Sequence, residues 1–162
     1  MEHMRNPKAA LIWITELLKD LNIPFQITGG LAAQAYGSKR ELQDIDLDIP
    51  EDKFDVIQTA VQEYIIYGPE IYISKNWNLL LMTLNYHHQE IDLGGAYNTQ
   101  IFNPKTNRWH ELITDFSKAI PREVLGLTLP VISRDELLAY KKILARPVDL
   151  ADIKEIELFK PI

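Results

Sequence analysis

The chain has 162 residues, of which 46% are hydrophobic and 25% charged, a balance typical of one globular domain rather than a disordered chain. Its formal net charge of −6 disfavours broad attraction to nucleic acids or anionic membranes, and no apolar run reaches the roughly 20 residues that span a bilayer. With no cysteine there is no disulfide or thiolate zinc site, so we expect a cytoplasmic protein without membrane association.

The N-terminal third of the chain predicts a helix, a strand and a second, shorter helix. Asn6 and Pro7 are typical N-cap and first-turn residues, and the apolar spacing that follows predicts a helix over 7–21. A strand over 24–28 then leads into the pair Gly29-Gly30, and helix-forming residues fill 31–36. A strand that ends in glycines before a helix lets backbone N–H groups approach an anion such as phosphate.

The next strand, over 44–49, alternates acidic and apolar residues. The two-residue period of a strand places Asp44, Asp46 and Asp48 on one face, and the apolar residues between them on the other. The apolar face can pack while the acidic face collects cations. For Asp48 a second interpretation stays open, in which it belongs to a solvated edge strand that discourages aggregation.

The middle of the chain predicts one helix and three strands. We expect a helix from Pro50 and a turn at Gly68-Pro69. The expected strands cover 71–73, 79–86 and 89–93, the last ending at Gly94-Gly95. In that last strand Glu90 and Asp92 share one face.

The C-terminal half is predicted to begin with loop over 96–108, followed by a helix-like stretch over 110–118. A last strand is expected over 127–132, and Ser133 with Glu136 matches a capping box that starts a helix reaching Ala145. Pro147 separates it from a final helix over 149–159. These elements favour an α+β fold with a small mixed sheet and helices over one face. We expect one domain over 1–162, with helices at about 133–159 packed on it.

Two motifs resemble the nucleotidyltransferase superfamily, whose fold is that of the DNA polymerase β catalytic domain. They are Thr28-Gly29-Gly30 and, after a thirteen-residue spacer, Asp44-Ile45-Asp46-Leu47. The stretches 131–141 and 146–153 also resemble small bacterial members, including lincosamide and aminoglycoside nucleotidyltransferases and nucleotidyltransferase toxins. The resemblance implies a polymerase β-like α+β fold with a sheet flanked by helices.

The resemblance also implies metal-dependent nucleotidyl transfer. Asp44 and Asp46 are the expected ligands of Mg²⁺, with Mn²⁺ as the alternative, because hard cations prefer carboxylate oxygens. A two-metal site needs one more carboxylate, which also draws the proton from the acceptor, and Asp92 is our choice.

The triphosphate of the donor is expected at the glycine turn. Gly29 and Gly30 would present backbone amides to it, and Lys39 or Arg40 would neutralise its tail.

For the other polar and aromatic residues, a catalytic or binding role is less strongly indicated. Glu90 either assists or replaces Asp92, or it is structural. His87 and His88 are better explained as solvated turn residues than as metal ligands. Trp77 and Trp109 either stack on a ring of a ligand or pack in the interior. A helix-end ion network is favoured over a catalytic set for the group Lys141, Arg146, Asp149 and Asp152.

The sequence thus predicts a Mg²⁺-dependent enzyme that transfers an NMP group from an NTP to a hydroxyl of a small molecule, an RNA or a protein. The alternative is a non-catalytic nucleotide-binding domain, or one partner of a toxin–antitoxin pair, on the same scaffold. A homodimer or an antitoxin partner is compatible with either hypothesis.

Overall fold

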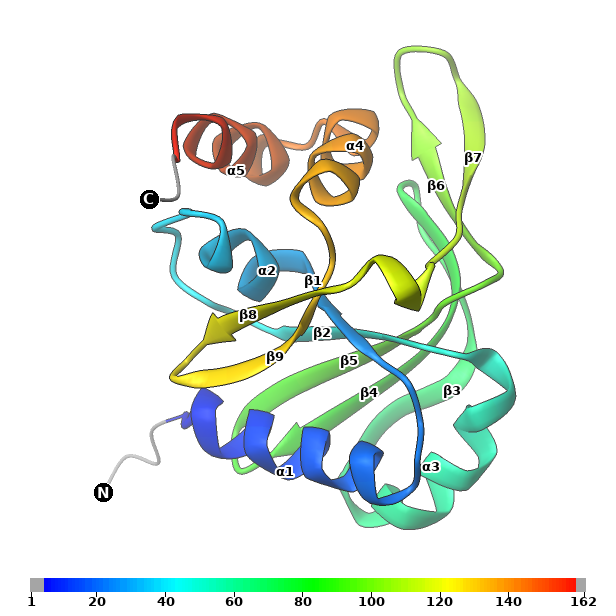
Figure 1. Cartoon of the computed structure of the whole chain (residues 1–162). Helices are drawn as coiled ribbons and strands as arrows, with labels where there is room; N and C mark the ends of the chain where they lie inside the picture. Colours follow the sequence, from blue (N-terminus) through cyan, green and yellow to red (C-terminus); the bar gives the residue numbers. More distant parts are fainter. Residues whose placement is uncertain (1–4, 160–162) are drawn as a thin grey trace.

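The computed structural model describes residues 5–159 as a mixed sheet with helices on both sides (Figure 1). The helices are α1 (Pro7–Asp20), α2 (Gly29–Ala35), α3 (Phe54–Val61), α4 (Arg134–Leu144) and α5 (Pro147–Leu158). The strands are β1 (Gln26–Thr28), β2 (Ile45–Ile49), β3 (Ile65–Ile73), β4 (Trp77–Tyr86), β5 (Gln89–Gly95), β6 (Thr99–Asn103), β7 (Arg108–Leu112), β8 (Ile120–Val124) and β9 (Leu127–Val131). Three 3₁₀ turns cover Glu51–Lys53, Gln62–Tyr64 and Phe116–Lys118.

The strands form one nine-stranded sheet in the order β7-β6-β4-β5-β2-β1-β9-β8, with β3 paired to β4 outside this path. The pairs β2–β5 and β1–β9 are parallel and the others are antiparallel. The mixed α+β class is as predicted, but the sheet is larger than expected. The helices also do not cover one face only: α1 and α3 lie on one side, and α2, α4 and α5 on the other (Figure 1).

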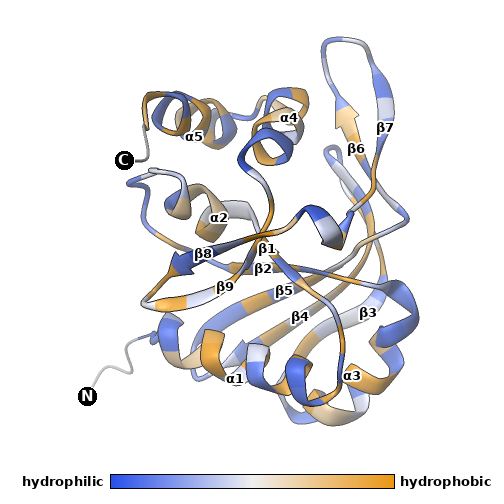
Figure 2. Cartoon of the chain, viewed as in Figure 1, coloured by the Kyte–Doolittle hydropathy of each residue, from blue (hydrophilic) through white to orange (hydrophobic). Residues whose placement is uncertain are grey.

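The central strands expose different chemistry on their two faces. In β2 the apolar residues Ile45, Leu47 and Ile49 are buried, whereas the aspartates between them are partly exposed. The same alternation is visible as changing colour along the strands in Figure 2. Helix α1 begins as predicted, with the Asn6 side chain accepting a hydrogen bond from the Ala9 N–H, and it contributes buried residues to the core. One face of β2 is thereby fixed in the core, and the acidic face is left for a site.

Of two expectations about glycine-containing segments, one was wrong. Gly68-Pro69 is not a turn between elements but lies inside β3, where the pairing with β4 shifts register between Tyr67 and Glu70. Proline has no backbone N–H to donate to a neighbouring strand. It is tolerated here because β3 pairs with β4 alone and the register shift interrupts the regular hydrogen bonding. Strand β5 ends at Gly94-Gly95 as expected, although both glycines still belong to the strand and pair with β2.

The segment between β5 and β9 was also predicted incorrectly. Residues 99–103 and 108–112 form the β6–β7 hairpin instead of a loop and a helix, and β8 was not expected. Only a 3₁₀ turn at Phe116–Lys118 remains of the predicted helix. These strands are short and polar, so their pairing partners rather than their own residues determine their conformation.

The C-terminal helices follow their sequence signals. Ser133 caps α4 by accepting a hydrogen bond from the Glu136 N–H, and Pro147 starts α5. Several of their residues belong to the same hydrophobic cluster as the sheet and α1, including Leu137, Tyr140 and Ile156. Residues 1–4 and 160–162 of the expected domain lie outside the described residues.

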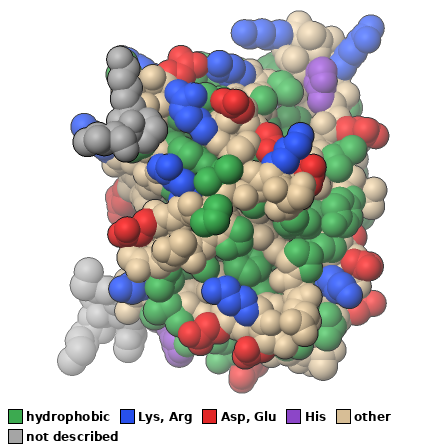
Figure 3. All heavy atoms as spheres, viewed as in Figure 1, with side chains coloured by type: hydrophobic (Ala, Val, Ile, Leu, Met, Phe, Trp, Pro, Cys, Tyr) green, Lys and Arg blue, Asp and Glu red, His purple; other side chains and the backbone are tan. Residues whose placement is uncertain are grey.

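The surface is mixed in character. Acidic and basic side chains alternate with hydrophobic ones over the face seen in Figure 3. Within residues 5–159 no helix is both long and apolar enough to cross a membrane.

Candidate active site

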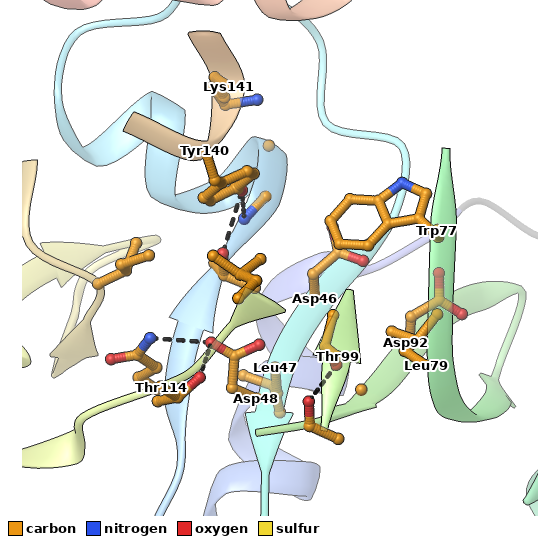
Figure 4. Close-up of a pocket in the computed structure, with 18 of the residues that line it drawn as sticks. Asp46, Leu47, Asp48, Trp77, Leu79, Asp92, Thr99, Thr114, Tyr140 and Lys141 are labelled. Atoms are coloured by element: carbon orange, nitrogen blue, oxygen red, sulfur yellow. Dashed lines mark hydrogen bonds between the residues drawn. The ribbon is translucent and has the colours of Figure 1, made fainter. Parts of the chain in front are cut away.

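Two neighbouring strands carry the carboxylates at the centre of the site. The parallel register of β2 and β5 pairs Asp46 with Asp92, so the two side chains leave the same face of the sheet side by side (Figure 4). The Thr83 hydroxyl on β4 donates a hydrogen bond of 2.6 Å to Oδ1 of Asp92. The fold therefore brings together two carboxylates that lie far apart in the sequence.

The carboxylates of this group repel one another. Burial raises the pKa of Asp46 to about 8, and the neighbouring charges of Asp92 and Asp44 add to the shift. Burial also raises the pKa of Asp92, although the hydrogen bond from Thr83 opposes this effect. Asp44 precedes β2 directly and lines the same cavity. A cation placed among these side chains would relieve the repulsion.

The donor set suits a hard divalent cation. Among residues 5–159, no three carboxylate, imidazole or thiolate groups already form a metal-binding cluster. Mg²⁺ is commonly held by only one or two carboxylates, with water and substrate phosphate oxygens completing its shell, and Mn²⁺ accepts the same oxygens. Asp46 and Asp92 supply two carboxylates, and Asp44 lies beside them. These residues therefore fit such an ion when phosphate oxygens complete its coordination shell.

The glycine turn lies against the acidic strand. Gly29 has a φ of +64°, and Oδ2 of Asp46 lies 2.1 Å from the position that a Cβ on Gly29 would occupy. Only glycine leaves room for the carboxylate and adopts this backbone conformation at little cost. The Gly29 N–H donates to the Tyr140 hydroxyl at 3.1 Å, and the Thr28 hydroxyl is also 3.1 Å from that oxygen. Tyr140 thus ties α4 to the turn.

A network of five charged residues borders the same turn: Arg40, Lys141, Arg146, Asp149 and Asp152. Asp152 accepts hydrogen bonds from Arg40 Nε and Nη2 at 3.1 and 2.9 Å, and it pairs with Lys141 Nζ at 3.0 Å. Asp149 pairs with Lys141 Nζ at 3.3 Å and with Arg146 Nε at 2.7 Å. The predicted helix-end ion network is confirmed, and Arg40 joins it.

The network is buried but leaves cationic groups at the cavity. Side chains of Asp149 and Asp152 are 0% exposed and that of Lys141 is 2% exposed. Although burial acts to raise it, hydrogen bonds from Arg40 and Lys141 hold the pKa of Asp152 below its ordinary value. Arg40, Lys141 and Arg146 all line the cavity, and three cations against two carboxylates leave one net positive charge.

The structure separates the two basic candidates of the loop after α2. Arg40 lies beside Gly30, with Nη2 3.1 Å from the position of a Cβ on that glycine, and it lines the cavity. Lys39 is exposed and does not line the cavity, although its backbone N–H donates to Glu155. Of the two, only Arg40 lies within reach of a ligand at the glycine turn.

Asp48 is not on an edge strand. It lies on β2 between β5 and β1, so the interpretation as a solvated edge residue was wrong. Gln26 Nε2 and Thr114 Oγ1 donate hydrogen bonds to its Oδ2 at 2.8 and 3.1 Å. Burial raises the pKa of Asp48 to about 6, and these two hydrogen bonds oppose the rise.

The remaining candidates divide between the cavity and the surface. Trp77 lines the cavity, with Arg146 Cζ 5.9 Å from its ring centroid, whereas Trp109 is 41% exposed on β7 and contacts Phe102. Glu90 is exposed and does not line the cavity. His87 and His88 are exposed in the turn between β4 and β5, as expected for turn residues.

Sequence reasoning missed four residues that hold the site in place: Gln26, Thr83, Thr114 and Tyr140. The sequence gives only a weak indication of a role for Thr83, which is a polar residue within the mainly apolar strand predicted over 79–86. The other three act through partners that are distant along the chain, and no spacing indicates such contacts.

The carboxylates, the glycine turn and the basic residues described above line one cavity of about 640 Å³. In Figure 4, Asp46 lies between Lys141 at one end and Asp48 with Thr114 at the other, and Asp92 lies on the neighbouring strand. The first end also carries the ion-pair partners of Lys141 and the glycine turn, which Arg40 contacts at Gly30. Phosphate is attracted to the first end by hydrogen-bond donors and cations. The arrangement suits a reaction between a phosphorylated ligand and a second ligand at the carboxylates.

Comparison with known proteins gives the family and the fold. The sequence model of the aminoglycoside-2''-adenylyltransferase family matches residues 10–156, while no curated protein sequence matches the chain. A candidate nucleotidyltransferase from Thermotoga maritima, TM1012, is 19% identical with a TM-score of 0.67 over 94% of both chains.

Two antibiotic-modifying enzymes are also similar in structure. Lincosamide adenylyltransferase LnuA, solved with lincomycin bound, is 17% identical with a TM-score of 0.62 over 93% of this chain and 96% of LnuA. ANT(2'')-Ia is 16% identical with a TM-score of 0.63 over 96% of this chain and 83% of that protein, and it has also been solved with adenylyl-2''-tobramycin. The family match and the shared fold show that this chain is a nucleotidyltransferase and belongs to the aminoglycoside-2''-adenylyltransferase family.

Proposed function

We propose that the enzyme transfers an adenylyl group from ATP to a hydroxyl of a small antibiotic-like acceptor, with Mg²⁺ or Mn²⁺ as cofactor. The observation that carries this proposal is the register that sets Asp46 beside Asp92, next to a glycine turn and at the wall of one cavity. In the reaction, a bond forms between the acceptor oxygen and the α-phosphorus of ATP. The bond from that phosphorus to the bridging oxygen breaks, and pyrophosphate leaves.

The glycine end of the cavity would bind the triphosphate. Arg40, Lys141 and Arg146 face it and supply N–H donors and positive charge. The amide of Gly29 is already bonded to Tyr140, so Gly30 is the better candidate for a backbone contact with phosphate.

Asp44, Asp46 and Asp92 would hold the divalent cation. The bound ion supplies charge stabilisation at the phosphate oxygens that become more negative during transfer. Asp92 has a further role as the group that accepts the proton of the attacking hydroxyl, and the hydrogen bond from Thr83 holds its carboxylate in place.

The proposed acceptor is small because the cavity has the size of a small-molecule site. The presence of lincomycin in LnuA and of adenylyl-2''-tobramycin in ANT(2'')-Ia supports an antibiotic-like molecule with several hydroxyls. The choice of ATP as the donor is inferred from the family alone, so the assay should compare all four NTPs.

The test is transfer of label from each α-³²P-labelled NTP to tobramycin or lincomycin, with and without Mg²⁺. We expect Asp46→Asn and Asp92→Asn each to lower the rate by at least about 10³-fold, because each removes a charge that acts on the reacting atoms. Glu63→Gln removes one charge at an exposed position outside the cavity and should transfer at the parental rate. Full activity of either aspartate variant, or equal activity in EDTA, would contradict the proposal.

A further inference from the structure

Strand β3 is an edge of the sheet that exposes apolar side chains. It pairs with β4 alone, and no other described strand lies along its outer side. Of the thirteen large hydrophobic side chains exposed among residues 5–159, four lie on β3: Ile66, Ile71, Tyr72 and Ile73. Ile71 and Ile73 are 60% and 66% exposed, so this edge presents a cluster of apolar surface to water.

The backbone of the same segment has hydrogen-bonding groups without a partner. The Ser74 N–H donates to the Trp77 carbonyl at 2.8 Å, and the register pairs Tyr72 with Leu79. In an antiparallel pair, residues bonded to the neighbouring strand alternate with residues whose N–H and C=O groups point away from it. The N–H and C=O groups of Ile71 and Ile73 therefore point to the outer side of β3, where the described chain offers them no strand.

The two halves of β3 differ in how well they resist pairing with another chain. In the first half the register shifts between Tyr67 and Glu70, and Pro69 has no N–H to donate. Bulges, prolines and charged side chains are the usual means by which proteins protect a sheet edge. Residues 71–74 contain none of these features, so this half of the edge is free to extend the sheet.

The unprotected segment is complementary to itself. An antiparallel pairing of two copies about a two-fold axis at Tyr72 sets Ile71 opposite Ile73 of the partner subunit and joins their outward N–H and C=O groups. Glu70 precedes the segment and Lys75 follows it, so the same pairing lays the acidic end of each strand along the basic end of the other. Backbone, apolar side chains and charge thus all favour a second copy of this chain as the occupant.

We propose that two copies of the chain associate through the outer edges of β3 in this register and form one continuous sheet. Tyr72 is 40% exposed and lines the cavity of its own subunit. The pairing brings Tyr72 of the partner subunit directly opposite, with the two Cα atoms about 4.5 Å apart, because this is a non-hydrogen-bonded pair. Each subunit therefore adds an aromatic side chain beside the cavity of the other.

Sedimentation equilibrium of the full chain tests the association. We expect the parent to be a dimer at micromolar concentration, and Ile73→Lys to raise the dissociation constant of the dimer at least about 100-fold, because it sets a charge against an apolar contact. The exposure of Ile73 leaves the core of the subunit undisturbed. Ile120→Lys is the matched control, since Ile120 is 43% exposed on β8 at the other end of the sheet, and it should remain a dimer.

A disulfide tests the register. The chain has no cysteine, so Tyr72→Cys introduces one thiol per subunit. A Cα separation of about 4.5 Å lies within the range that a disulfide spans, and diamide should oxidise the two thiols to an intermolecular disulfide. Ile120→Cys, with its thiol on the opposite edge, should stay unlinked. Thermal unfolding of each variant checks that it is folded.

Three outcomes would overturn the inference: a monomeric parent, a dimer as tight in Ile73→Lys as in the parent, or a Tyr72→Cys variant that is linked no faster than Ile120→Cys. These measurements need neither nucleotide nor acceptor. Their failure would therefore leave the proposed function untouched, and a failure of the transfer assay would leave the β3 dimer standing.

Discussion

Two groups of charged residues meet at the cavity, one buried and one partly buried, and their charges are compensated in different ways. In the network of α4 and α5, each buried aspartate has two cationic partners within 3.3 Å. On the acidic face of β2 and β5, Asp46 and Asp92 have each other as neighbours and, of the described residues, no cation in an ion pair. The charges of the first group are paired, whereas the carboxylates of the second group form no ion pair with the described residues.

The difference indicates which group is structural and which is functional. Charges that are paired and hydrogen-bonded hold two helices to the loop after α2, and removing one member leaves its partners buried and uncompensated. Like charges placed together in an interior are unfavourable until a ligand brings the opposite charge, and such groups occur mainly at functional sites. The predictions below test this distinction.

The largest effect on stability is expected from breaking the network. Lys141→Met leaves Asp149 and Asp152 with one cationic partner each, and the free energy of unfolding should fall by about 3–5 kcal/mol. Urea unfolding measures the change. The neighbouring Lys142 pairs with Glu157, and these side chains are 56% and 49% exposed, so Lys142→Met should cost less than about 1 kcal/mol. Similar losses in both variants would show that the network is not structural.

The acidic face should respond in the opposite direction. Burial and the neighbouring carboxylates raise the pKa of Asp46 from its ordinary value of 3.8 to about 8 in the folded chain, so the folded state binds this proton more tightly than the unfolded state. The resulting stability is present below about pH 4 and is lost as the pH rises to about 8. Asp46→Asn removes this loss, and at pH 9 in EDTA it should be more stable than the parent by on the order of 2 kcal/mol.

Thermal unfolding at pH 4 and pH 9 measures this effect. At pH 4 the parent and Asp46→Asn should be nearly equal in stability. With Mg²⁺ and an unreactive ATP analogue the parent should gain more stability than the variant, because ligand binding stabilises the folded state. A variant that is less stable than the parent at pH 9 in EDTA would mean that Asp46 is compensated like Asp152.

The smallest effect concerns the side chain that holds Asp92. Thr83→Val removes the hydroxyl that donates to Asp92, and we expect a loss of about 1 kcal/mol in stability and about a tenfold lower kcat. The KM for ATP should change little. Thr83→Ser keeps the hydroxyl and should restore the rate, which a purely steric role of the threonine would not explain. Equal rates for all three proteins would exclude a positioning role.

Local signals in the sequence account for much of the fold. Asn6 and Ser133 cap the helices that they were predicted to cap, because capping is a contact between residues three positions apart. The acidic alternation of 44–49 likewise gives a strand with one buried apolar face. The hairpin over 99–112 was missed because short polar strands are stable only through their partners.

The sequence by itself determined that an acidic strand follows a glycine turn, since both properties belong to adjacent residues and to the period of a strand. Only the tertiary structure decided that Asp92 stands beside Asp46, that Arg40 rather than Lys39 reaches the cavity, and that Asp48 is held by Gln26 and Thr114. The physical reason is that register and burial depend on how distant segments pack, and spacing along one chain does not encode those contacts directly.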